Sequence, residues 1–242
     1  MNVLTHARRR CIHPTLVTKI GDDMLSEVVR QHCASAHIDT SYLFVAKDRP
    51  TPFTFVIVDD KTHSRTCIHT PGDELHVSEV DFRRILSGQA PGECRFDAVY
   101  LDGRHTAAAL DCAKLVSQLY PNIPLFVECE RPREGLTELM TMATHLITSK
   151  SYALQDRQHV LHGMHSLLFN TQNRRVTAVV TTIGEMGAVL MRKADMHAPI
   201  HREWSCFDDA WQHMQVHSYM MFSYDIFISI SGIVSDKHLK VH

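Results

Sequence analysis

The chain has 242 residues, of which 44% are apolar and 21% charged, and its formal net charge at pH 7 is −2. These proportions are typical of a globular domain with one sizeable core. The near-neutral charge offers no electrostatic footprint for nucleic acid or for an anionic membrane, so we expect neither as a partner. No stretch has the roughly 18 apolar residues of a membrane span, and the first ten residues do not resemble a secretory signal.

The cysteines are scattered along the chain. There are seven, and no two have CxxC spacing. This pattern argues against a disulfide framework or a zinc site and favours a reducing compartment. We therefore expect a cytoplasmic protein.

The first predicted elements are a strand over residues 15–20 and a helix that follows it to about residue 34. Asp22 or Asp23 is expected to cap this helix. Its expected apolar face consists of Met24, Leu25, Val28 and Val29.

Three strand-like runs follow, at residues 41–47, 53–59 and 65–70. Turn-forming residues separate them and no helical pattern intervenes. We therefore expect all three to form one antiparallel ribbon.

Strands and helices then alternate to about residue 191. The predicted order is a helix at 78–86, a strand at 97–101, a helix at 106–119, a strand at 124–128, a helix at 135–143, a strand at 145–148, a helix at 157–168 and strands at 176–181 and from 188. Such repeats predict a mostly parallel sheet with helices on both faces. Ligands of these sheets bind at the carboxyl ends of the strands.

Three of those strand ends carry candidate site residues. Asp102 and Arg104 follow the strand at 97–101, and such a pair could hold a polyol. The alternative, which spacing alone favours, is that Asp102 caps the next helix. Glu128 and Glu130 end the next strand and suit a magnesium-water shell, or else a solvated loop with salt bridges.

The third strand end reads Thr182–Ile183–Gly184–Glu185–Met186–Gly187. Its glycines and its threonine hydroxyl could approach a nucleotide phosphate. Tight β-hairpins use the same residues, so the pattern alone leaves both interpretations open.

Taken together, these stretches resemble the PfkB family of ribokinase-like carbohydrate kinases. The runs that carry the resemblance are GDD at 21–23, PFTFVIVD at 52–59, RTCIHTPG at 65–72, LDGRH at 101–105, VECERPREG at 127–135, ITSKSYA at 147–153 and VTTIGEMG at 180–187. Their order and spacing match over about residues 2–192. The acid–Gly–Arg and E-x-P-R-E runs are most similar to the ketohexokinase-like, plant-type branch.

The resemblance implies a ribokinase-like layered fold, with a mostly parallel sheet flanked by helices and a small antiparallel lid at about residues 41–70. It implies transfer of the γ-phosphoryl group of ATP, with Mg²⁺, to a small sugar or nucleoside. It also implies that the lid could form a homodimer. We therefore expect a kinase domain at residues 1–192 and a divergent tail at residues 193–242.

The resemblance also assigns roles to single residues. The substrate-binding set is Asn2, Asp102 and Arg104. The nucleotide-binding set is Ser149, Lys150, Thr182, Gly184 and Gly187. Glu130 matches the acidic strand end near the metal.

The chain departs from the family pattern at both ends. The family's catalytic Asp lies in a Gly-Ala-Gly-Asp motif, and no such motif follows Gly187, so we assign no catalytic residue. We interpret Asp208 as the cap of a helix instead. Nothing before Asn2 supplies the family's first strand and Gly-Gly loop, so we expect low stability or dimerisation through uncovered sheet.

Three alternatives to an active kinase remain. One is a pseudokinase that binds a sugar or nucleotide without turnover, and another is an incomplete gene product. The third is a dinucleotide-dependent oxidoreductase, which would need GxGxxG after the first strand. That strand is followed by GDDMLS instead.

Overall fold

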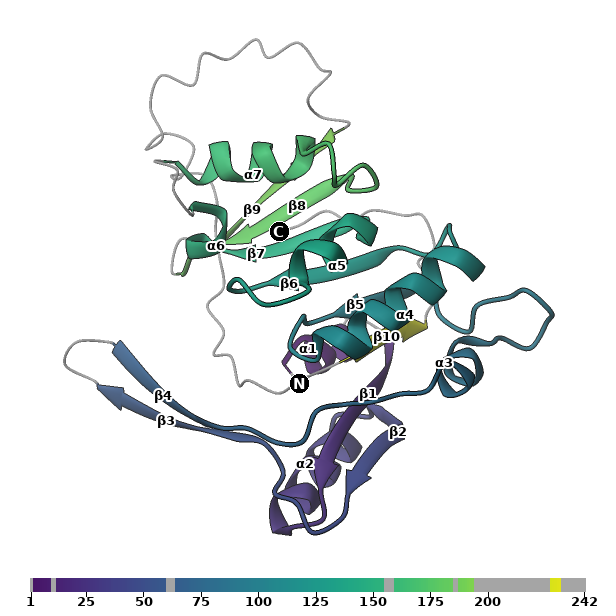
Figure 1. The fold of residues 1–242 in the computed structure, drawn as a ribbon. Coiled ribbons are helices and arrows are strands. Elements are labelled where there is room, and N and C mark those ends of the chain that lie inside the picture. The colour runs from purple at the N-terminus through teal and green to yellow at the C-terminus, as the bar shows by residue number, and fades with distance from the viewer. Residues whose placement is uncertain are drawn as a thin grey trace.

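The computed structural model describes residues 2–9, 12–59, 64–154, 159–184, 187–193 and 227–231. At its centre is an eight-stranded sheet in the order β2-β1-β10-β5-β6-β7-β8-β9 (Figure 1). The strands are β1 (His13–Gly21), β2 (Asp39–Ala46), β5 (Ala98–Leu101), β6 (Leu125–Cys129), β7 (His145–Ser149), β8 (Ala178–Thr182), β9 (Ala188–Arg192) and β10 (Phe227–Ser231). All pair in parallel except β9 and β10, which are antiparallel to their neighbours.

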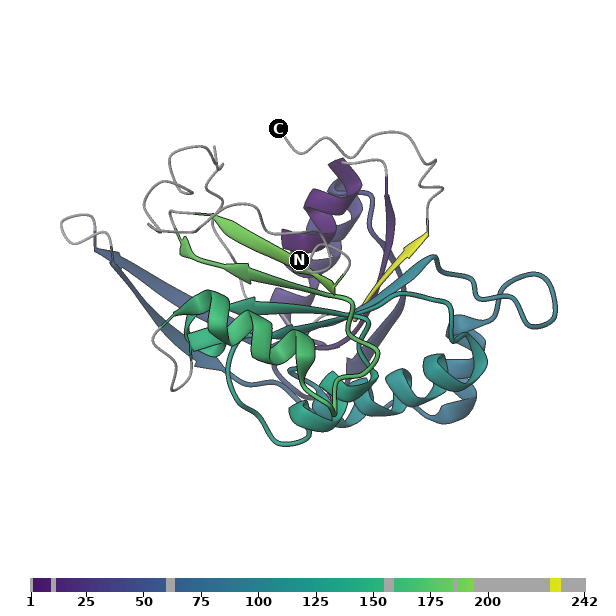
Figure 2. The same ribbon diagram turned by 90° about the horizontal axis from the view of Figure 1, so that it is seen from above.

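Helices cover both faces of this sheet (Figure 2). One face packs against α3 (Glu79–Leu86), α4 (Thr106–Leu119), α5 (Leu136–Met142), α6 (Lys150–Leu154) and α7 (Val160–Phe169), which together form the larger core cluster. The other face packs against α1 (Asn2–Arg9) and α2 (Met24–Ser35), whose buried residues form a smaller cluster. The predicted layered α/β architecture is confirmed, whereas α1, α6 and β10 were not predicted.

Among the described residues, no helix combines the length and the apolar character that crossing a membrane requires.

The start of α2 agrees with its sequence, but its buried face does not. Asp23 caps the helix by accepting the N–H of Ser26 at 3.1 Å. Val29 and Cys33 are buried, whereas Met24 is 86% exposed and Val28 57% exposed. The predicted apolar face is therefore correct at Val29 and wrong at Met24 and Val28, because the stripe through Val29 and Cys33 is what packs into the smaller core cluster.

The prediction of a three-stranded ribbon is also wrong, because only two of the three strands form it. β3 (Phe53–Asp59) and β4 (Ser64–Thr70) form an antiparallel pair that projects from the body (Figure 1). β2 instead joins the main sheet, parallel to β1. The reason is α2, which lies between β1 and β2 in the chain and returns β2 in the same direction as β1.

The strand β10 fills the centre of the sheet. It pairs with β1 on one side and β5 on the other, antiparallel to both. The backbone edges of β1 and β5 that face each other are therefore paired through β10 rather than left open. The expected low stability stays a prediction, as does dimerisation through uncovered sheet.

We predict that Ser229→Pro destabilises the whole sheet. Ser229 pairs with Thr15 and with Val99, so proline at this position removes a ladder N–H between two other strands. We expect a loss of about 1–3 kcal/mol in the free energy of unfolding, which is about 2–4 °C in Tm for each kcal/mol. Thermal and urea unfolding measure it.

Ser229→Thr is the matched control, because it keeps the N–H and suits a strand. If Ser229→Pro unfolds at the same temperature and the same urea concentration as Ser229→Thr, β10 does not hold the sheet together.

Candidate active site at the carboxyl edge of the sheet

The carboxyl ends of four neighbouring parallel strands form the edge at which the candidate site lies. Leu101 pairs with Val127, and Ser149 pairs with Thr182, so these strands end nearly level. Neighbouring strands lie about 4.8 Å apart, which puts the tips of β5 and β8 about 14 Å from each other.

The loop after β5 has a compact turn that starts at Asp102. Oδ1 of Asp102 accepts the N–H of Arg104 at 3.0 Å. Gly103 has φ +70°, and a Cβ on it would lie 2.9 Å from the carbonyl oxygen of Glu128. Glycine therefore lets this loop lie directly against the end of β6.

Asp102 does not cap the next helix. The N-cap of α4 is His105, which makes no side-chain cap bond. The interpretation of Asp102 as a cap, which spacing favoured, is thus wrong. Its carboxylate instead lies at the strand end, where 11% of the side chain is exposed.

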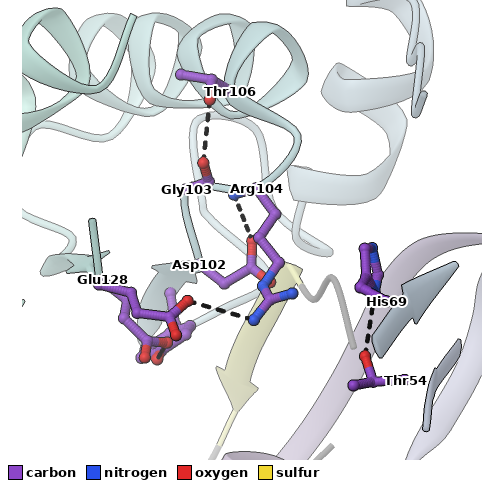
Figure 3. Close-up of polar contacts among 9 residues, drawn as sticks. Thr54, His69, Asp102, Gly103, Arg104, Thr106 and Glu128 are labelled. Carbon is purple, nitrogen blue, oxygen red and sulfur yellow. Dashed lines mark hydrogen bonds and ion pairs between the residues drawn. The ribbon is translucent and has the colours of Figure 1, made fainter. Parts of the chain in front are cut away.

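Arg104 connects the ends of β5 and β6. Its Nη2 lies 3.4 Å from Oε2 of Glu130, and its Nε lies 3.9 Å from Oδ2 of Asp102. Figure 3 shows the guanidinium between the turn at Asp102 and the end of β6. Only 16% of the Arg104 side chain is exposed, so the two carboxylates hold this cation in a partly desolvated position.

A second polar contact lies beneath this pair and was not predicted. The Tyr100 hydroxyl, on β5, donates a hydrogen bond to Glu128, on β6. Burial raises the pKa of the Glu128 carboxyl, although the Tyr100 hydrogen bond acts in the opposite direction. Burial also raises the pKa of Tyr100 well above its usual range. Alternation along one strand does not identify this pair, because the contact depends on the register of β5 against β6.

Ser149 and Lys150 lie at the junction of β7 and α6. The Ser149 hydroxyl donates to the carbonyl of Glu130 at 2.7 Å and accepts the N–H of Tyr152 at 3.1 Å. It therefore ties the ends of β6 and β7 together and caps α6. Lys150 is exposed at the same end.

The turn between β8 and β9 is a tight hairpin. Gly184 has φ +67° and Gly187 has φ +89°, and the N–H of Gly187 bonds to the carbonyl of Gly184 at 2.9 Å. This motif therefore does form a tight β-hairpin, which was one of its two interpretations. Thr182 and Gly184 are exposed at the edge that also carries Asp102 and Glu130, so the turn can still meet a phosphate.

The remaining predicted residues are placed only in part. Asn2 begins α1, and its side chain lies outside those described. Asp208 lies outside the described residues altogether. Within the described part of the chain, no group of three or more His, Cys, Asp or Glu residues could hold a metal ion. Glu130, with 45% of its side chain exposed, lies 3.4 Å from the Arg104 guanidinium at this edge.

Solved structures of kinases share this fold. A putative ribokinase from Agrobacterium tumefaciens is 21% identical, with a TM-score of 0.58 over 74% of this chain and 55% of that one. A ribokinase from Arabidopsis thaliana complexed with ribose and ATP is 13% identical, with a TM-score of 0.61 over 80% and 62%. A fructokinase from Vibrio cholerae O395 in fructose-, ADP- and calcium-bound form is 16% identical, with a TM-score of 0.58 over 79% and 64%.

The chain thus spans less than two thirds of the length of these structures, and at such identities the likeness establishes the ribokinase-like fold alone. No curated protein sequence matches the chain. The sequence model of the pfkB family carbohydrate kinases matches residues 1–203, which is most of the chain. This chain therefore belongs to the pfkB family of carbohydrate kinases.

Proposed function

We propose that this chain transfers the γ-phosphoryl group of ATP to a hydroxyl group of a small sugar or nucleoside. The observation that supports it most directly is the position of Arg104, held between Asp102 and Glu130 at the carboxyl edge of the sheet. A guanidinium in a partly desolvated site stabilises the charge that develops on a transferring phosphoryl group. A carboxylate beside it can accept hydrogen bonds from sugar hydroxyls.

In this proposal the acceptor lies at the tip of β5. Asp102 orients the acceptor hydroxyl, whose oxygen bonds to the γ-phosphorus while the bond from that phosphorus to the β–γ bridging oxygen breaks, ADP leaves and the hydroxyl proton passes to solvent water. Arg104 neutralises charge on the phosphoryl oxygens during transfer. Asn2, by its match to the family's sugar loop, would be a further substrate contact.

The nucleotide lies toward β7 and β8 in this proposal. Thr182 and Gly184 are exposed at the β8–β9 turn, where backbone N–H groups and a hydroxyl can approach phosphates. Gly187 closes the turn. Lys150 would contribute a positive charge, and Ser149 would hold the two strand ends that support it.

Glu130 is the proposed contact to Mg²⁺. Mg²⁺ usually keeps several waters and binds one or two carboxylates together with substrate phosphates, and when bound it neutralises charge on the β- and γ-phosphates. A carboxylate that is 45% exposed at the strand end suits such water-mediated contact.

A non-catalytic pseudokinase is the second candidate, because one observation favours it. Phosphoryl transfer releases the proton of the acceptor hydroxyl, and the family's base is the Asp of a Gly-Ala-Gly-Asp motif. After Gly187 the sequence contains a single glycine, Gly232, and so lacks that motif. A protein of this kind would bind the sugar or nucleotide without turnover.

Several finer assignments belong to the same proposal. We place the chain in the ketohexokinase-like, plant-type branch on the run RTCIHTPG at 65–72. We assign the kinase domain to residues 1–192, to whose sheet the later segment Phe227–Ser231 adds the strand β10. We place the protein in the cytoplasm, because the described cysteines are all free thiols, which suits a reducing compartment.

We predict that Asp102→Asn reduces turnover. The test measures ADP release from Mg-ATP with a panel of ketoses, ribose and nucleosides. An amide can still accept the Arg104 N–H but cannot offer a charged acceptor to the sugar, so we expect roughly a 10- to 100-fold lower kcat/KM. Glu79→Gln is the control, since Glu79 forms an exposed ion pair with Arg83 within α3.

Equal activity of Asp102→Asn and the control would contradict the assigned pocket. Sugar or nucleotide binding by calorimetry, without ADP release, would select the pseudokinase. Neither binding nor turnover with any member of the panel would contradict both candidates.

We further propose that the ribbon β3–β4 forms a homodimer contact. Register places Phe55 opposite Ile68, with Ile57 two residues along on the same face. These side chains are 61%, 54% and 48% exposed, respectively. A two-stranded ribbon is marginal by itself, and an exposed apolar face of this kind is typical of a protein–protein contact.

We predict a dimer that Phe55→Asp converts to a monomer, as measured by sedimentation equilibrium over a range of concentrations. Val58→Asp is the matched control, because Val58 is 58% exposed on the opposite face of the same ribbon. A wild-type protein that stays monomeric at high concentration, or a Phe55→Asp variant that dimerises like the control, would exclude this contact.

A further inference from the structure

The ribbon β3–β4 leaves the body through a loop that crosses the end of β1. Gly21 is the last residue of β1, and a Cβ on it would lie 2.1 Å from the carbonyl oxygen of Arg49 and 2.6 Å from the nitrogen of Thr51. Only glycine allows the two segments to lie this close. The first arm of the ribbon is therefore packed directly onto the strand end.

A hydrogen-bonded cluster holds this crossing in place. Thr51 is 1% exposed, and its hydroxyl donates to Oδ1 of Asp23 at 2.6 Å while accepting the N–H of Gly21 at 3.0 Å. The N–H of Thr51 also donates to Oδ2 of Asp23 at 3.0 Å. Because Asp23 caps α2 as well, this one carboxylate joins β1, α2 and the arm of the ribbon.

The second arm is anchored beside the first. Asp73 lies 3.5 Å from Nζ of Lys19 and 3.4 Å from Nε of Arg49. The same Lys19 Nζ donates to the carbonyl of Glu74 at 3.1 Å. A Cβ on Gly72 would lie 2.7 Å from the Cδ of Pro52, so the two arms also pack against each other.

We call the anchored base of the ribbon, around Thr51 and Asp73, its root. The root lies at the same edge of the sheet as the candidate site. β1 and β5 are both antiparallel to β10, so they run in the same direction and their carboxyl ends share one edge. Figure 3 shows Thr54 and His69 of the ribbon, joined by a 3.0 Å hydrogen bond, in the same close-up as Asp102 and Arg104.

The angle at the root controls where the ribbon lies. Each strand of the ribbon has seven residues, which extend about 23 Å. A tilt of about 10° at the root would therefore move the tip by about 4 Å. A two-stranded ribbon has little packing of its own to resist such a tilt.

We propose that Asp23 and Thr51 are positioning residues that fix the ribbon over the substrate edge and so set the affinity for the acceptor sugar. This inference rests on the proposed kinase function. Neither side chain contacts the substrate. They act through the ribbon, by holding the first arm at the end of β1.

Thr51→Val tests the proposal, because it keeps the side-chain shape and removes the hydroxyl. We expect the KM for the acceptor to rise roughly three- to tenfold with kcat nearly unchanged, because the loss lies in substrate binding rather than in the transfer step. We also expect faster amide hydrogen exchange in β3 and β4 and unchanged exchange in β6. Thr51→Ser keeps the hydroxyl and should behave like the wild type in both measurements.

Unchanged exchange in β3 and β4 of Thr51→Val would overturn the proposal, as would an equal rise in β6, which would mean general destabilisation. Equal effects of Thr51→Val and Thr51→Ser would overturn it too. If the wild type phosphorylates no acceptor, the kinase function fails. The sugar Kd then replaces KM, and the exchange rates still support or overturn the anchoring of the ribbon.

Discussion

The arrangement of the candidate site depends on one constraint, which is that parallel strands end on a common edge. The strand β5 delivers Asp102 and Arg104 to that edge, and β6 delivers Glu130 beside them. The Arg104 guanidinium joins the two strand ends through both carboxylates. A cation fixed in this way needs little rearrangement to meet a phosphoryl group, which is the condition under which electrostatic stabilisation is most effective.

The same edge also sets the position of the ribbon. β1 runs in the direction of β5 because β10 lies between them, antiparallel to both. The end of β1 carries Gly21, against which the first arm of the ribbon packs. The central strand, the ribbon root and the loop at Arg104 are thus linked through one hydrogen-bonded layer. A change in β10 is expected to reach both parts of the site.

Much of this architecture follows from local sequence, and the failures have physical causes. Alternating strand and helix patterns predicted the order from α3 to β9 except for α6, and Asp23 was one of the two predicted caps of α2. The pairing of β2 could not be read from its own residues, since α2 before it determines its direction. Which residues of α2 are buried depends on the elements that pack against the helix, so its own apolar pattern did not predict its buried face. β10 pairs with strands more than a hundred residues away, and no local pattern specifies such a partner. The Tyr100–Glu128 contact required the register of two strands.

The central claim is that acceptor and triphosphate lie side by side along the carboxyl ends of β5 to β8. A crystal structure of the protein with an acceptor sugar and a non-hydrolysable ATP analogue tests it most directly. The account predicts the sugar beside Asp102, and the phosphates between Arg104 and the turn at Gly184. Ligands bound at the amino ends of the strands, or on a helical face away from Arg104, would contradict it.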